Sequence, residues 1–151
     1  MKDPAIVETM RHKFRVIQLL TEIAVPELLR RANKHDNTKI EAPEREMFDE
    51  VTEKLAGLTY GSPEYKDSLK QLKPALDHHY AHNSHHPEHY KEGINDMNLF
   101  DLMEMFFDWK AASERHNDGN INKSIEHNGG RFDMSPQLIK IFENTAKMLG
   151  Y

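Results

Sequence analysis

The sequence contains no cysteine, and this absence excludes several classes of protein at once. Without thiols the chain forms no disulfide, no iron–sulfur cluster and no thiolate zinc site. No apolar run approaches the length of a membrane span, and the N-terminus lacks the apolar core of a signal peptide. We therefore expect a cytoplasmic protein without a membrane partner, in which any metal ion is held by imidazole and carboxylate groups.

The 151 residues are enough for one domain with a core of its own. Charged residues make up 30% of the chain and hydrophobic residues 38%, with a formal net charge of −5. This negative balance argues against a nucleic-acid polymer as the partner. It leaves room for a small anionic substrate in a local basic pocket, and it leaves a homo-oligomer open.

The chain also lacks any run of alternating apolar and polar β-formers, any internal repeat and any low-complexity linker. Apolar residues instead recur every three or four positions, which is the period of an α-helix. A well-buried helix is predicted from Pro4, and Pro26 should break or kink it before residues 27–33 continue. A second helix is predicted to open at Pro43.

A long helix should begin after Ser62 and carry Pro74 as a kink or division. Further helices are predicted over residues 99–115 and 121–128, the second stopped by Gly129-Gly130, and over the C-terminus from Ser135. The sequence therefore predicts an all-α protein: a single-domain bundle of six or seven helices over residues 1–151.

Six of the ten histidines lie between Asp77 and Tyr90. In a helix, positions 78, 82 and 85, or positions 79, 82 and 86, would line one side. Pro87 disfavours the helical conformation at His86, so the last imidazoles should lie on a turn. A solvated polar face is the ordinary explanation, but so dense a cluster favours metal binding.

Three other candidates lie outside the cluster. His12 is in the first predicted helix, and His35-Asp36 forms a dyad at the end of the second helical run. Asp108 stands between Phe107 and Trp109, where a carboxylate is partly buried and needs a cation or several donors.

This ordered set resembles the ligand order of the HD-domain superfamily, which comprises helical metal-dependent phosphohydrolases and some diiron oxygenases. The fragment His-Asp-Asn-Thr-Lys at residues 35–39 is similar to the His-Asp-x-Gly-Lys of that superfamily, with Thr38 in place of glycine. The run from Leu76 to Ala112, with His-His-Pro-Glu-His-Tyr and Asp-Trp-Lys-Ala-Ala, also resembles an uncharacterised family common in phages and bacteria. The chain lacks the Gly-Tyr-Pro signature, so cyclic-dinucleotide specificity is not implied.

The chemistry of these residues predicts one or two divalent transition ions, namely iron, manganese, zinc or cobalt. Asp36 would bridge two ions, one of them also bound by His12, His35 and Asp108. Either His82 with His86 or His79 with His85 would hold the other. Two ions roughly 3.5–4 Å apart can activate a water and clamp the oxygens of a displacement at phosphorus.

The remaining roles have alternatives. One imidazole of the cluster should contact the substrate or support a ligand instead of binding metal, and we assign His85 to this catalytic role. Lys39, the other catalytic candidate, either binds a phosphate oxygen or neutralises Asp36. Arg115, His116 and Lys123 form a substrate rim or simply a basic helix end. Asp101 and Glu104 share a face with Asp108, where Asp101 orients a histidine or the three form a solvated acidic stripe.

Three functions follow from this pattern. The first is a metal-dependent phosphohydrolase acting on a small phosphoester or nucleotide. The second is a diiron oxygenase of HD type, and the third is a non-enzymatic, metal-stabilised phage-like protein that binds a host partner.

Overall fold

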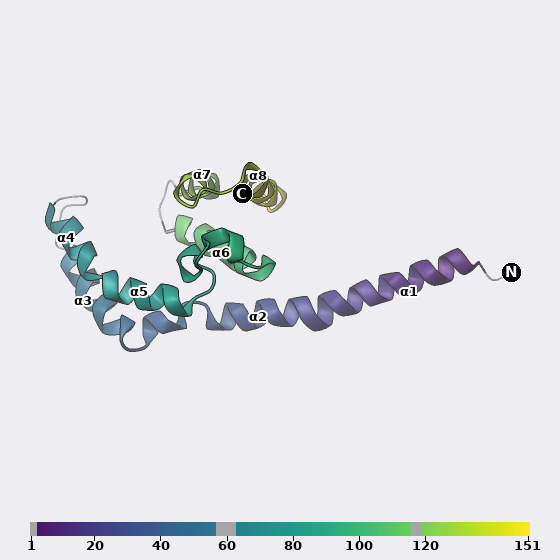
Figure 1. The fold of residues 1–151 in the computed structure, drawn as a ribbon, viewed down its shortest axis with the longest axis horizontal. Coiled ribbons are helices and arrows are strands. Elements are labelled where there is room, and N and C mark those ends of the chain that lie inside the picture. Colours follow the sequence, from purple (N-terminus) through teal and green to yellow (C-terminus); the bar gives the residue numbers. More distant parts are fainter. Residues whose placement is uncertain (1–2, 57–62, 116–118) are drawn as a thin grey trace. The chain divides into compact units, whose positions relative to one another are not determined.

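The computed structural model describes residues 3–56, 63–115 and 119–151, and every regular element in these ranges is a helix (Figure 1). The α-helices are α1 (Pro4–Leu19), α2 (Val25–Lys34), α3 (Glu44–Ala56), α4 (Pro63–Gln71), α5 (Lys73–His82), α6 (Leu99–Ser113), α7 (Ile121–Arg131) and α8 (Pro136–Met148). Shorter elements are the π-helical turn η1 (Leu20–Ala24) and the 3₁₀ turns η2 (Asn37–Ile40), η3 (Pro87–His89) and η4 (Gly93–Asp96). The all-α prediction is confirmed.

Some of these helices follow one another without a loop. The turn η1 joins α1 directly to α2, and only Leu72 separates α4 from α5, just before Pro74. The described residues therefore form six continuous helical stretches, within the predicted six or seven. None of the described helices has both the length and the apolarity to cross a bilayer.

The chain divides into two compact units, Met1–His35 and Asp36–Tyr151. The first unit holds α1, η1 and α2, and the second holds every later helix together with the histidine cluster. The single HD-like domain stays a prediction.

The N-terminal unit is one long helix. Asp3 caps it by accepting hydrogen bonds from the backbone N–H groups of Ala5 and Ile6, and Pro4 occupies its first turn. Pro26 does not break the helix, because η1 precedes it: a wider π-helical turn accommodates the missing N–H and the bulk of the proline ring. The predicted burial was wrong, since no residue of α1, η1 or α2 is buried.

The hydrophobic core of the second unit lies among α6, α7 and α8. Its buried members are Met105, Phe106, Ile121, Ile125, Met134, Phe142 and Ala146. The prediction that Gly129-Gly130 ends α7 was wrong, because the helix continues to Arg131. A Cβ on buried Gly129 would lie 3.1 Å from Ile139 Cδ1 on α8, so this glycine permits close packing of the two helices.

Candidate metal centre

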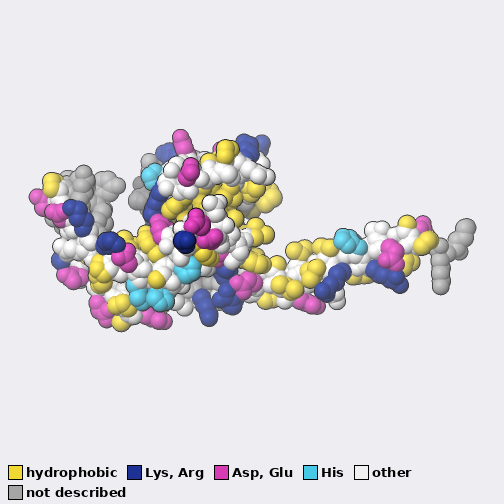
Figure 2. Space-filling view, in the orientation of Figure 1, with side chains coloured by type: hydrophobic (Ala, Val, Ile, Leu, Met, Phe, Trp, Pro, Cys, Tyr) yellow, Lys and Arg dark blue, Asp and Glu magenta, His cyan; other side chains and the backbone are white. Residues whose placement is uncertain are grey.

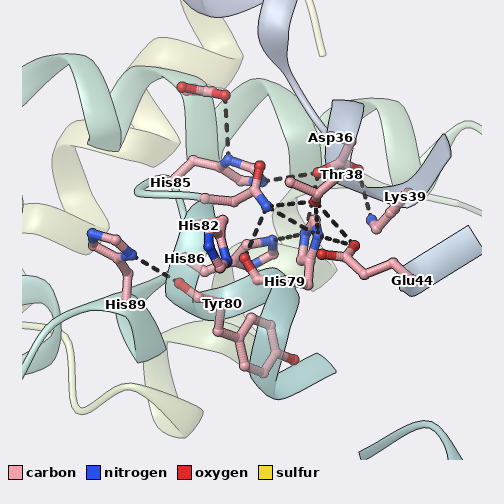
Figure 3. Close-up of polar contacts among 12 residues, drawn as sticks. Asp36, Thr38, Lys39, Glu44, His79, Tyr80, His82, His85, His86 and His89 are labelled. Atoms are coloured by element: carbon pink, nitrogen blue, oxygen red, sulfur yellow. Dashed lines mark hydrogen bonds and ion pairs between the residues drawn. The ribbon is translucent and has the colours of Figure 1, made fainter. Parts of the chain in front are cut away.

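Three imidazoles and one carboxylate of the second unit converge on one point (Figure 3). Asp36 Oδ1 lies 3.2 Å from His79 Nε2 and 3.4 Å from His85 Nε2. His86 Nε2 lies 3.0 Å from His79 Nε2. The four possible ligand atoms are all within 4.8 Å of one another.

The local backbone conformation positions these four side chains. Asp36 adopts a left-handed conformation (φ 56°) directly before η2, which aspartate tolerates better than most residues. His79 is on α5, which ends at His82 when Asn83 becomes extended. His86 is extended before Pro87, as predicted, so His85 and His86 leave the helix and turn back towards His79.

The ring of His79 is oriented by Glu44, at the first position of α3. Glu44 Oε2 lies 2.9 Å from His79 Nδ1, and Oε1 lies 2.7 Å from His78 Nδ1. A carboxylate only accepts, so Nδ1 of His79 donates and the lone pair of the neutral ring is on Nε2, facing Asp36. Thr38 Oγ1 donates to the same Glu44 oxygen at 3.0 Å.

His85 has a similar arrangement with α6. Its Nδ1 lies 3.2 Å from Glu104 Oε1, which directs Nε2 towards Asp36. Asp108, one helical turn further along α6, has a carboxylate oxygen within 4.8 Å of a ring nitrogen of His85. Carboxylates that hold the outer nitrogens of metal-binding histidines are a recurrent feature of metal sites.

Burial and charge set the protonation of the centre. Burial raises the pKa of Asp36, but the adjacent rings of His79 and His85 and the ammonium group of Lys39 lower it more, and the net pKa is far below the usual range. The pKa of His86 is lowered to about 3, mainly by burial and also by the nearby His85 and His79, while Asp108 and Asp36 oppose this. His86 is therefore neutral at pH 7, with a lone pair able to bind a metal.

The donor set fits a divalent transition metal. A neutral His79 ring that donates from Nδ1 has no proton on Nε2. Its Nε2 therefore cannot donate a hydrogen bond to Asp36 Oδ1 at 3.2 Å or to His86 Nε2 at 3.0 Å. A cation that accepts all of these lone pairs satisfies the contacts together. Imidazole-rich ligand sets with one carboxylate suit iron, manganese, zinc and cobalt.

Asp101 holds the segment that carries His85 and His86. Its carboxylate is fully buried and accepts hydrogen bonds from Ser84 Oγ and Tyr90 OH, both at 2.7 Å. It also accepts from the backbone N–H of Asn98, completing the N-terminal capping box of α6. Asp101 therefore ties both ends of the turn to α6.

Replacing Asp101 by alanine should lower the free energy of unfolding by about 3 kcal/mol, because the hydroxyls of two half-buried residues and a helix cap lose their acceptor. Urea unfolding of the full chain measures this loss. Asp96→Ala, at an exposed acidic residue of η4, is the control and should change stability by less than about 0.5 kcal/mol. Equal stability of the two variants would contradict the anchoring role.

The structure brings together part of the predicted ligand set. Asp36, His79 and His86 converge, and His85 joins them as a fourth candidate ligand rather than a separate substrate contact. His82 does not: it is exposed, its Nδ1 bonds to the carbonyl of His78, and its ring stacks on His78. Among the described residues, His82 is in no group of side chains that could hold a metal ion together.

Two predicted ligands lie in the N-terminal unit. His12 is exposed on α1, and His35 is the half-buried last residue of that unit. Asp108 is half-buried in the second unit, and its charge raises the pKa of His86. The roles of His12 and His35 as ligands stay predictions.

Of the two alternatives for Lys39, the ion pair is the one present: its Nζ lies 2.6 Å from Asp36 Oδ2. Arg115 and Lys123 are both exposed, on either side of the segment 116–118. His116 lies outside the described residues. The substrate rim stays a prediction.

Sequence reasoning missed four residues that support the ligands: Thr38, Glu44, Asn83 and, as a definite partner of His85, Glu104. Asn83 donates to Thr38 Oγ1 at 2.9 Å and to the carbonyl of His79 at 2.8 Å. Glu44 follows Pro43 in an acidic stretch that looks like an ordinary helix start, so nothing local marked it. The acidic face of α6 included Glu104, but the sequence pattern predicted the histidine contact at Asp101, because the partner of His85 depends on the path of the turn that carries it.

A family model matches residues 1–148, almost the whole chain, and is described as "Family of unknown function (DUF5662)". The chain belongs to this family. No curated protein and no solved structure matches it. Membership of DUF5662 carries no activity with it, so the HD-type chemistry stays a proposal.

Proposed function

We propose that this chain is a metal-dependent phosphohydrolase of HD type that hydrolyses a small phosphoester or nucleotide. The observation that supports this best is the convergence of Asp36, His79, His85 and His86, with two of the rings held from behind by carboxylates. A merely solvated histidine patch would not bury His79 and His85 to 1% and 2% exposure.

In this proposal the four residues bind one divalent transition ion and leave coordination positions open. When bound, such an ion lowers the pKa of a water to near neutrality and polarises a phosphoryl oxygen. Glu44 and Glu104 keep the rings of His79 and His85 in the orientation that aims Nε2 at the ion. Lys39, partly exposed beside Asp36, offers a positive charge to a phosphate oxygen.

A diiron oxygenase is the second candidate, and the excess of imidazole over carboxylate ligands favours it. In that case the same residues bind iron, with Asp108 near His85 as a further carboxylate. Metal content and reaction products separate the two activities.

The test is phosphate release by the metal-reconstituted full chain from a panel of phosphomonoesters, phosphodiesters and nucleotides, with manganese, cobalt, zinc or iron. We expect turnover that is lost on chelation and in Asp36→Ala. Lys39→Gln should keep the metal, because Lys39 is not a ligand, and should lose at least tenfold in kcat/KM, because it removes the phosphate contact along with the ion pair to Asp36. Lys70→Gln, at a lysine of α4 that pairs only with exposed Asp67, is the matched control.

Bound iron with oxygen-dependent absorption changes and no phosphate release would instead support the oxygenase. Bound metal with neither phosphate release nor oxygen-dependent absorption changes would overturn both enzymatic proposals and favour a binding protein.

A further inference from the structure

The N-terminal helix exposes more apolar surface than any other part of the described chain. Eleven of the eighteen exposed large hydrophobic residues lie between Ile6 and Leu29. Figure 2 shows hydrophobic side chains at the surface along much of this helix, with charged side chains between them. A soluble monomer rarely leaves such a row uncovered, so a contiguous exposed patch of this kind marks an interface.

Six of these eleven exposed residues form one stripe. Val7, Met10, Phe14 and Ile17 are spaced by three and four residues, which places them on one side of α1. A π-helical turn holds more residues than an α-helical turn, so residues four positions apart stay on the same side of the helix across η1. The stripe therefore continues from Ile17 through Thr21 to Val25 and Leu29. The large residues of this stripe are 40–58% exposed.

Charges along the same helix alternate in blocks. Asp3 and Glu8 are followed by the basic block Arg11, Lys13 and Arg15, then by Glu22 and Glu27, and last by the basic block Arg30, Arg31 and Lys34. Reversing the helix about the midpoint between Gln18 and Leu19 exchanges acidic blocks for basic ones: Asp3 meets Lys34, and Arg15 meets Glu22. Two copies side by side in the same direction would instead place like charges together.

We infer that this helix pairs antiparallel with the same helix of a second copy of the chain, centred near Gln18. The stripe supplies the apolar seam, the charge blocks set the direction, and the opposed helix dipoles favour it as well. The helix spans about 46 Å at 1.5 Å per residue, long enough for a seam of several turns. Within the same helix Arg11 also pairs with Glu8, and Glu27 with Arg30 and Arg31, but such surface pairs contribute little and can be shared.

The test is sedimentation equilibrium of the full chain, with twice the 17.6 kDa monomer mass expected, with or without chelator. Ile17→Glu, in the stripe, should give a monomer. Val16→Glu, at a neighbouring exposed valine off the stripe, is the matched control and should leave the dimer intact. A monomeric wild type, including one in which the stripe packs on the chain's own second unit, would overturn the inference, as would equal effects of the two substitutions.

Charge exchange tests the direction. Arg15→Glu and Glu22→Arg should each weaken the dimer at least tenfold, and the double variant should restore it, because only antiparallel pairing sets residue 15 against residue 22 of the partner. The chain has no cysteine, so Gln18→Cys should form a disulfide-linked dimer on oxidation while Arg11→Cys should not. Efficient crosslinking at both positions would mean parallel pairing.

Discussion

Replacing His86 by alanine should release the metal ion, whereas the same substitution at His82 should leave it bound. Both residues belong to one histidine-rich stretch and are only four positions apart. His86 Nε2 faces the shared point beside His79, while His82 is exposed and turned to the backbone of His78. Comparing the two variants therefore distinguishes a specific metal centre from a general affinity of the histidine-rich stretch for metal ions.

The expected loss of metal affinity in His86→Ala is large. Removing a group that only orients a ligand costs about 10–100-fold in metal affinity, so removing a ligand itself should cost more than about 100-fold. A metal present at 100 times its dissociation constant stabilises the fold by about 2.7 kcal/mol, and this increment should also disappear in His86→Ala. Elemental analysis after dialysis and thermal unfolding with added zinc or cobalt measure the two effects. Equal metal content in both variants would contradict the assignment.

Replacing Glu44 by alanine should lower the free energy of unfolding of the metal-free chain by about 3–5 kcal/mol. Glu44 is fully buried and accepts hydrogen bonds from His78, His79 and Thr38. Its removal leaves three buried or half-buried donors without their acceptor. Urea unfolding tests this, with Glu46→Ala on the exposed side of α3 as the control, expected within about 0.5 kcal/mol of wild type.

The pH dependence of stability should also reveal the contribution of Glu44. Burial raises the pKa of Glu44, but the hydrogen bonds from His78, Thr38 and His79 lower it more, and its net pKa lies below the usual value of 4.5. A group with a depressed folded-state pKa stabilises the fold above its unfolded pKa, and this contribution is lost as the pH falls through the folded one. Stability of the wild type should therefore fall on acidification below about pH 4.5, and Glu44→Gln should show a shallower fall. Parallel curves for the two proteins would contradict this.

Local chemistry made some features of the centre predictable. Pro87 alone indicates that His86 is extended, and the helical period with its prolines and caps places most helix boundaries. The density of histidines indicates where a metal centre would be. None of these inferences depends on contacts between distant segments.

Other features depended on packing. Gly129-Gly130 looks like a helix stop, yet α7 continues because Ile139 of α8 packs against Gly129. The buried Glu44 looks like an ordinary helix-start acid until α5 brings His78 and His79 to it. The exposed row on α1 has the period of a buried helix, since periodicity reports an apolar face and not what covers it.

The sequence by itself determined the helical class, the absence of thiol chemistry and the stretch in which imidazoles gather. Only the tertiary structure decided that Asp36 meets His79, His85 and His86, that Glu44 and Glu104 hold two of these rings, and that His82 stays outside. The reason is physical: helix period and turn preference act within a few residues, whereas the direction of an imidazole depends on a carboxylate 35 positions away in the case of His79 and Glu44.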